Sequence, residues 1–176
     1  KGYVYIHPYD DPDVIAGHVG VGALKYFDLS HHRKSDVVFR WDEALAFEGS
    51  TGPYLQYTHA RLKSILRKVE ADQRGTVRRS TQIPEASLDE VEHRLAAAIL
   101  RFPDAIEDAL KDYTPNTLAN YLYGLAKLAN EFYYSHPVTQ EPDEAKRKLR
   151  IALVSGVALT LKNGLNLLGI AAPEEM

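Results

Sequence analysis

The pattern of apolar and polar positions is helical along most of the chain. The strongest example is an apolar stripe near the end, in which residues recur every three or four positions: Leu149, Leu153, Val157, Leu161, Leu165 and Leu168. Such a stripe is typical of the buried face of an amphipathic helix. It predicts a helix that starts near Pro142 and ends before Gly169. Gly169 followed by Ile170 predicts a glycine stop with an apolar contact behind it.

A second long helix is predicted from about Pro53 to about Glu70, with Ser50, Thr51 or Gly52 as its cap. Its expected buried positions are Leu55, Leu62, Ile65, Leu66 and Val69. Shorter helical patterns cover 12–28, 87 to about 101, 103–110 and the region from 115 onward. The first of these carries three glycines among its apolar positions, Val14, Ile15, Val19, Val21, Leu24 and Phe27.

The connections complete the predicted fold. Ser87 with Glu90 is a capping-box signature for the helix that follows it. Residues 36–41 predict a short extended connection, and residues 71–87 are polar and aperiodic, which predicts a loop. The fold class is therefore all-α, a bundle of about four to six helices with a connecting extension at the N-terminus.

Composition narrows the possible classes. The chain has 176 residues, 45% of them hydrophobic and 26% charged, which suits one domain with a real core. The absence of cysteine excludes disulfides, thiolate metal sites and a cysteine nucleophile. No apolar run approaches the roughly 20 residues that span a bilayer. The first residues, KGYVYIHPYDD, do not resemble a signal peptide and lack an initiator methionine, so we expect a fragment of a longer chain.

The net charge of −3 does not by itself indicate a nucleic-acid-binding protein. The basic residues are nevertheless clustered, at 31–34, at 61–68, at 74–79 and at 146–150. Five acidic residues of the middle helices are candidates for an opposite, acidic side: Glu90, Glu92, Asp104, Glu107 and Asp108. Solvated helix faces are an alternative explanation of the clusters.

The candidate chemistry lies in the stretch FEGSTGPYLQYTHARLKSILRK, residues 47–68. On a helix, Tyr54, Tyr57 and Arg61 share one face, and Lys68 continues it. Aromatic rings beside cations suit RNA, because rings stack on bases while Arg and Lys meet phosphates. The spacing leaves open a second interpretation, in which both rings pack against a neighbouring helix.

Other kinds of site find little support. Seven histidines offer no pair at metal-ligand spacing, so no metal site is predicted. VSGVAL at 154–159 is not a nucleophile elbow, and GVGALK at 20–25 has too few glycines for a phosphate loop. No catalytic residue is predicted, and an independent small enzyme has no supporting motif.

Residues 47–68 resemble the helix that opens the anticodon-binding domain of arginyl-tRNA synthetases. VGVGALKYFDLSHHRKSDVVFRWDEALAFEG, at 19–49, resembles the segment before it, and LANEFYYSHPV, at 128–138, with residues 150–176, resembles the closing helices. The resemblance implies an α-helical anticodon-binding domain over 49–176 and, over 1–48, a remnant of the region that links it to the catalytic domain. The His-Ile-Gly-His and Lys-Met-Ser-Lys-Ser-like motifs of that catalytic domain are absent from this chain, so it is expected to be inactive alone.

The resemblance also implies partners and a site. The partners are arginine tRNA and the enzyme's own catalytic domain, with ATP and Mg used by the full-length enzyme and no cofactor in this chain. The implied protein is a cytoplasmic monomer without a membrane contact. The expected tRNA-binding residues are Tyr54, Tyr57, Arg61, Lys68, Tyr134 and Met176. Trp41 is expected to be a packing residue. The alternative is a helical protein-interaction module derived from the same domain without tRNA recognition.

Overall fold

The computed structural model describes residues 11–72 and 87–176, and within them the chain is all-α, as predicted. The helices are α1 (Pro12–Ser30), α2 (Trp41–Ala44), α3 (Gly52–Asp72), α4 (Glu90–Leu100), α5 (Phe102–Lys111), α6 (Pro115–Ser135) and α7 (Glu144–Leu167). None of these helices combines the length and the apolar character that a bilayer-spanning segment needs.

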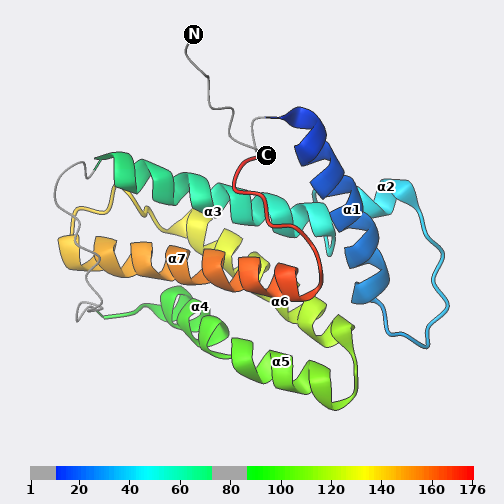
Figure 1. The fold of residues 1–176 in the computed structure, drawn as a ribbon. Coiled ribbons are helices and arrows are strands. Elements are labelled where there is room, and N and C mark those ends of the chain that lie inside the picture. The colour runs from blue at the N-terminus through cyan, green and yellow to red at the C-terminus, as the bar shows by residue number, and fades with distance from the viewer. Residues whose placement is uncertain (1–10, 73–86) are drawn as a thin grey trace, which may run out of the picture.

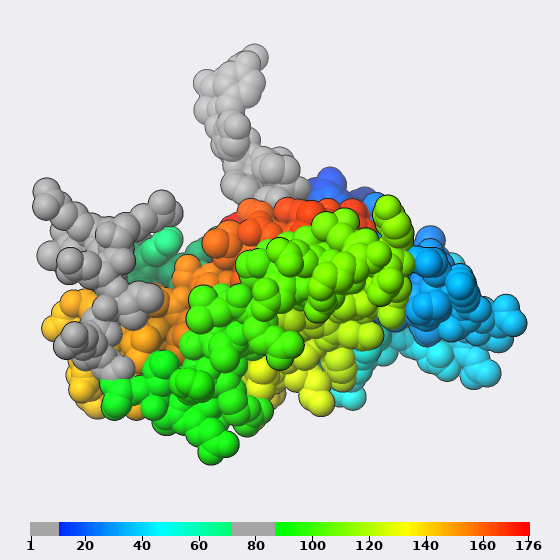
Figure 2. Space-filling view, turned by 90° about the horizontal axis from the view of Figure 1, so that it is seen from below, coloured from blue at the N-terminus to red at the C-terminus, as the bar shows by residue number. Residues whose placement is uncertain are grey.

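Helices α3, α6 and α7 form the centre of the bundle, and each contacts the other two (Figure 1). Helices α4 and α5 pack on α6, where they form much of the surface seen in Figure 2. Helix α1 crosses α3 and also contacts α6. The C-terminal tail leaves α7 and returns along α3 (Figure 1). The two long predicted helices therefore lie side by side in the core.

The stripe of α7 faces that core, as its spacing predicts. All six of its residues are buried, and none is more than 7% exposed. The helix also ends as predicted, because Gly169 has a φ of +69° and Ile170 is 1% exposed. The amide of Ile170 donates to the Leu165 carbonyl at 2.9 Å, which is the C-terminal hydrogen bond of a Schellman motif.

Helix α1 is present, but its predicted apolar stripe is wrong. The buried residues of α1 are Gly22, Ala23 and Tyr26, whereas Val21 and Leu24 are 54% and 49% exposed. The reason is a close crossing, since a Cβ on Gly52 of α3 would lie 2.6 Å from the Gly22 carbonyl oxygen. Small residues therefore make the contact at the crossing, and the predicted Val21 and Leu24 lie on the exposed side of α1.

Trp41 is also not the packing residue that was expected. It is 61% exposed, and its ring meets that of Phe39 edge-on, with centroids 4.8 Å apart. Together with the outward side of α1, it leaves an exposed apolar region at this end of the bundle.

The capping box of α4 lies two residues later than predicted. The Asp89 carboxylate accepts from the Glu92 amide, and the Glu92 carboxylate accepts from the Asp89 amide, both at 3.0 Å. Glu92 is fully buried and pairs with Arg150 of α7 at 2.7 Å. This tertiary partner favours the later box over the one that Ser87 and Glu90 would form. Most of the predicted loop at 71–87 lies outside the described residues.

Candidate nucleic-acid interface

Arg61 of α3 lies against two tyrosines at the end of α6. Its guanidinium carbon is 4.0 Å from the centroid of the Tyr133 ring and 5.5 Å from that of Tyr134. Both distances are within the range of a cation–π contact. Tyr134 is 79% exposed, so its ring is open to a ligand. The structure thus brings together the predicted Arg61 and Tyr134, and it adds Tyr133.

Tyr54 lies two turns earlier on α3 and faces the middle of α6. Its hydroxyl oxygen accepts a hydrogen bond from Asn130 Nδ2 at 2.7 Å, and its ring meets the edge of Tyr123 at 5.8 Å. Burial raises the pKa of the Tyr54 hydroxyl, which keeps its proton available for donation. Lys127 Nζ lies 5.8 Å from the centroid of the Tyr123 ring.

These side chains form one surface between α3 and α6, which we call the cation–aromatic face. Its members are Tyr54, Arg61, Tyr123, Lys127, Asn130, Tyr133 and Tyr134. It combines exposed ring surface with cations and with one amide that can hydrogen-bond a base edge. These are the groups that hold unpaired nucleotides.

Two further predicted residues border this face. Lys68 lines a hollow of about 480 Å³ together with Tyr133, Tyr134 and residues 135–140. Tyr57 lies one turn before Arg61 and is 46% exposed, and its ring meets the edge of Phe47 at 6.3 Å. A cation and an exposed ring are therefore available on either side of Arg61.

Met176 is not brought to this face by the contacts that hold the tail. The carbonyls of Ala171 and Pro173 accept from Gln56 and His59, and both carboxylates of Glu174 and Glu175 pair with cations of α3. On a helical wheel these α3 residues lie roughly opposite Arg61. Met176 is 40% exposed, and its place in an RNA interface stays a prediction.

Several members of the basic clusters already have partners within the chain. The C-terminal tail forms ion pairs with two of them. Lys63 Nζ lies 3.1 Å from a carboxylate oxygen of Glu174, and a guanidinium nitrogen of Arg67 lies 3.2 Å from one of Glu175. Arg33 donates to the carbonyls of Asp112 and Tyr113 at the end of α5. The cluster at 74–79 lies outside the described residues.

The cluster at 146–150 is likewise structural. Arg150 is 6% exposed and donates to Glu92 at 2.7 Å and to Glu141 at 2.6 Å. Glu92 is therefore a core ion-pair partner, and it does not belong to an acidic surface as expected. His136 Nε2 lies 2.7 Å from Asp89, which ties the end of α6 to the start of α4. This network holds residues 136–141, most of which line the hollow beside Tyr134.

The same network contains three groups with metal-ligand chemistry. Ligand atoms of Asp89, Glu92 and His136 lie within 4.8 Å of one another. The carboxylate of Glu92 already pairs with Arg150 at 2.7 Å and with Lys146 at 3.6 Å. The geometry fits a set of ion pairs that joins three helices, because the cations are protein side chains.

His59 makes the stability of the domain depend on pH. It is fully buried, and burial lowers its pKa below the usual 6.5, although a hydrogen bond to the Pro173 carbonyl acts the other way. The unfolded chain therefore binds the proton more readily. The contribution of His59 to the free energy of unfolding is expected to level off above pH 6.5. Below pH 6.5 this contribution is expected to fall, by at most about 1.4 kcal/mol per pH unit.

The measurement is urea unfolding between pH 8 and pH 5, comparing the chain with His59→Gln. The free energy of unfolding of the variant is expected to change less with pH over this window, whatever its absolute value. An equal slope in both proteins would show that His59 is not the titrating group. The carboxylates of Asp89 and Glu174 also have lowered pKa values, but they titrate below this window.

This helical bundle presents the rings and cations with which proteins hold unpaired RNA bases and phosphates. Comparison with known proteins gives the family, since residues 55–176 match the family model described as the DALR anticodon binding domain. The chain belongs to this family of anticodon-binding domains.

Curated relatives and solved structures agree. The chain is 40% identical over 168 residues to the arginine–tRNA ligase of Alkaliphilus metalliredigens, a match that covers 95% of this chain and 28% of that protein. The arginine–tRNA ligase of Escherichia coli K12 is 39% identical, with 96% and 29% covered. The Thermus thermophilus arginyl-tRNA synthetase superposes with a TM-score of 0.84 at 39% identity, over 95% of this chain and 28% of that one. The Plasmodium falciparum arginyl-tRNA synthetase gives a TM-score of 0.81 at 30% identity, over 96% and 29%. The chain thus spans less than a third of the length of each of these four relatives.

Several members of the face were missed in the sequence. Tyr123, Lys127, Asn130 and Tyr134 recur at intervals of four, three and four residues, so they share one strip of α6. This polar and aromatic periodicity could have identified three of them beside Tyr134. Tyr133 lies off that strip, and only its contact with Arg61 assigns it to the face.

Proposed function

We propose that this chain is the tRNA-binding part of an arginine–tRNA ligase, and that its cation–aromatic face holds the anticodon loop of arginine tRNA. The observation that carries the proposal is the Arg61 guanidinium, which lies over Tyr133 and beside the exposed ring of Tyr134. An anticodon loop offers bases that can be splayed out and stacked on such rings. The family of the chain and the ligases among its relatives support the same function.

Each predicted residue has a role in this proposal. Tyr134 and Tyr57 supply ring surface for the bases, and a base stacked on a ring contributes about 1–3 kcal/mol. Arg61 and Lys68 neutralise nearby phosphates, so affinity falls as salt is raised. Tyr54 fixes the floor of the face through Asn130. Met176, which is 40% exposed at the end of the tail, is proposed to contact the RNA from outside this face.

The full-length protein would supply the chemistry. We propose a cytoplasmic, monomeric ligase in which residues 49–176 form the anticodon-binding domain and residues 1–48 lead to a catalytic domain that uses ATP and Mg²⁺. The apolar side chains exposed near that connection would contact the catalytic domain: Val14, Val21, Leu24, Val38 and Trp41. Several exposed large apolar side chains on neighbouring segments are what an interface with another folded unit would use.

Filter binding tests the proposal. The chain is expected to bind a transcript of an arginine tRNA more tightly than the same transcript with its anticodon bases replaced, at several salt concentrations. Equal affinity for both transcripts would contradict anticodon recognition. A pull-down that recovers a protein partner and no RNA would favour an interaction module instead.

A further inference from the structure

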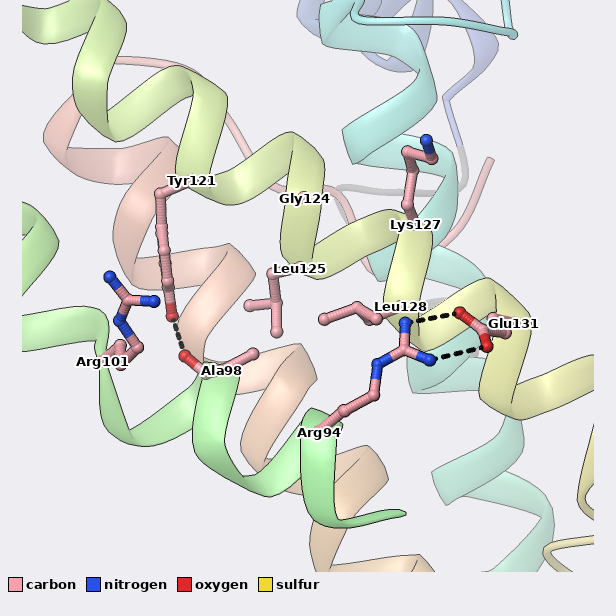
Figure 3. Close-up of a pocket in the computed structure, with 9 residues that line it drawn as sticks. All are labelled: Arg94, Ala98, Arg101, Tyr121, Gly124, Leu125, Lys127, Leu128 and Glu131. Carbon is pink, nitrogen blue, oxygen red and sulfur yellow. Dashed lines mark hydrogen bonds and ion pairs between the residues drawn. The ribbon is translucent and has the colours of Figure 1, made fainter. Parts of the chain in front are cut away.

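A second hollow lies beside the cation–aromatic face, between α6 and α4. Its volume is about 680 Å³, and its floor is apolar, with Ala98, Leu125 and Leu128 (Figure 3). The Tyr121 hydroxyl donates to the Ala98 carbonyl at 2.7 Å and closes one wall. The hollow is therefore built from fixed elements of two helices.

The rim of the hollow is mainly cationic. Arg94 comes from α4, Arg101 is the residue that joins α4 to α5, and Lys127 comes from α6. The one carboxylate of the lining is Glu131, which accepts two hydrogen bonds from Arg94, each at 3.1 Å. Among the described residues, neither Arg101 nor Lys127 has an acidic group within ion-pairing distance. The net charge of the lining is thus positive, with Arg94 compensated.

Lys127 connects this hollow to the cation–aromatic face. In Figure 3 its side chain points away from the apolar floor, and its Nζ lies 5.8 Å from the Tyr123 ring. Glu131 follows Lys127 by four residues, and Asn130 of the face immediately precedes Glu131. The hollow and the face therefore occupy adjoining strips of α6, so one ligand can contact both.

We propose that the hollow between α4 and α6, with Arg101 and Lys127 on its rim, binds backbone phosphates of the RNA stem that carries the loop. This inference rests on the proposed function of the cation–aromatic face. A positive rim beside a base-binding face is complementary to a strand that continues past the splayed bases. Phosphate contacts of this kind position the RNA without reading its sequence.

Glu131 sets the strength of this contact. Its bidentate pair with Arg94 occupies a guanidinium that would otherwise meet a third phosphate. Both partners are about half exposed, so the pair contributes little to folding. Arg94, at the end of the hollow away from Arg101, would therefore become available to phosphate if Glu131 lost its charge.

Charge-reversal variants test the proposal by filter binding to an RNA hairpin with the anticodon stem and loop, and to the loop sequence as a single strand. Arg101→Glu is expected to weaken hairpin binding about tenfold and to lower the slope of log affinity against log salt by about 1 or 2, with little change for the single strand. Glu131→Gln is expected to strengthen hairpin binding several-fold and to steepen the slope. Lys148→Glu is the control, because Lys148 lies on α7 and pairs with Glu144.

Hairpin binding that is unchanged in both Arg101→Glu and Glu131→Gln, while Arg61→Ala weakens it, would overturn the role of the hollow and leave the proposed function intact. If Arg61→Ala also has no effect on either RNA, the proposed function fails as well. A gain of affinity in Glu131→Gln would not follow from a merely structural role of the ion pair.

Discussion

Replacing Arg61 by alanine is expected to weaken binding of arginine tRNA by about tenfold or more. The substitution removes a cation beside the anticodon loop. It also removes the planar guanidinium that packs on the Tyr133 ring. Stacking and charge-assisted contacts of this kind contribute about 1–3 kcal/mol each, and 1.4 kcal/mol is a factor of ten. Equilibrium filter binding at two salt concentrations measures the change.

Two matched variants make the Arg61 result specific. Arg61→Lys keeps the charge but loses the planar group, so it is expected to recover the salt dependence and only part of the affinity. Lys111→Ala removes an exposed cation of α5 that pairs with Asp108, and it is expected to bind as the parent chain does. An equal loss of affinity in Lys111→Ala would mean that Arg61 acts only through net charge.

Replacing Arg150 by alanine is expected to lower the free energy of unfolding by about 3–5 kcal/mol. The variant removes the nearer cation of Glu92, which is fully buried and keeps Lys146 at 3.6 Å, and it removes the donors to Glu141 and to the Pro137 carbonyl. The loss of a hydrogen-bonded cation from a buried carboxylate is costly because water cannot take its place. Urea unfolding at pH 7 measures the loss.

The double variant Glu92→Gln with Arg150→Met distinguishes the stranded charge from lost packing. It removes both charges and keeps the volume and an amide that can serve the α4 cap. We expect it to be more stable than Arg150→Ala, because the fully buried carboxylate of Glu92 is replaced by a neutral amide. A double variant that is no more stable than Arg150→Ala would show that packing, and not the stranded charge, causes the loss.

The helices were predictable where the local pattern and the tertiary contacts agree. The α7 stripe is regular, so its buried face and its glycine stop follow from spacing alone. The buried face of α1 does not follow from spacing, because the close crossing at Gly22 and Gly52 requires small residues where large apolar ones are usual. The predicted position of the α4 cap was also wrong because of a tertiary contact. The observed position depends on Arg150, which lies 58 residues from Glu92 in the sequence.

The site was predictable in part. Helical spacing on α3 indicated Tyr54 and Arg61, and the structure pairs each of them with α6. Spacing could not show that the tail neutralises Lys63 and Arg67, because those contacts join residues 107 or more positions apart. Charge clusters in a sequence do not say which members are already paired.

The most direct test of the central claim is a titration of isotope-labelled protein with the anticodon hairpin, followed by the NMR signals of individual residues. The account predicts that the largest changes fall on Arg61, Asn130 and Tyr133 and on their neighbours in α3 and α6. It predicts small changes along the outer side of α5. Changes concentrated on α5, with Arg61 and Tyr133 unaffected at saturation, would contradict it.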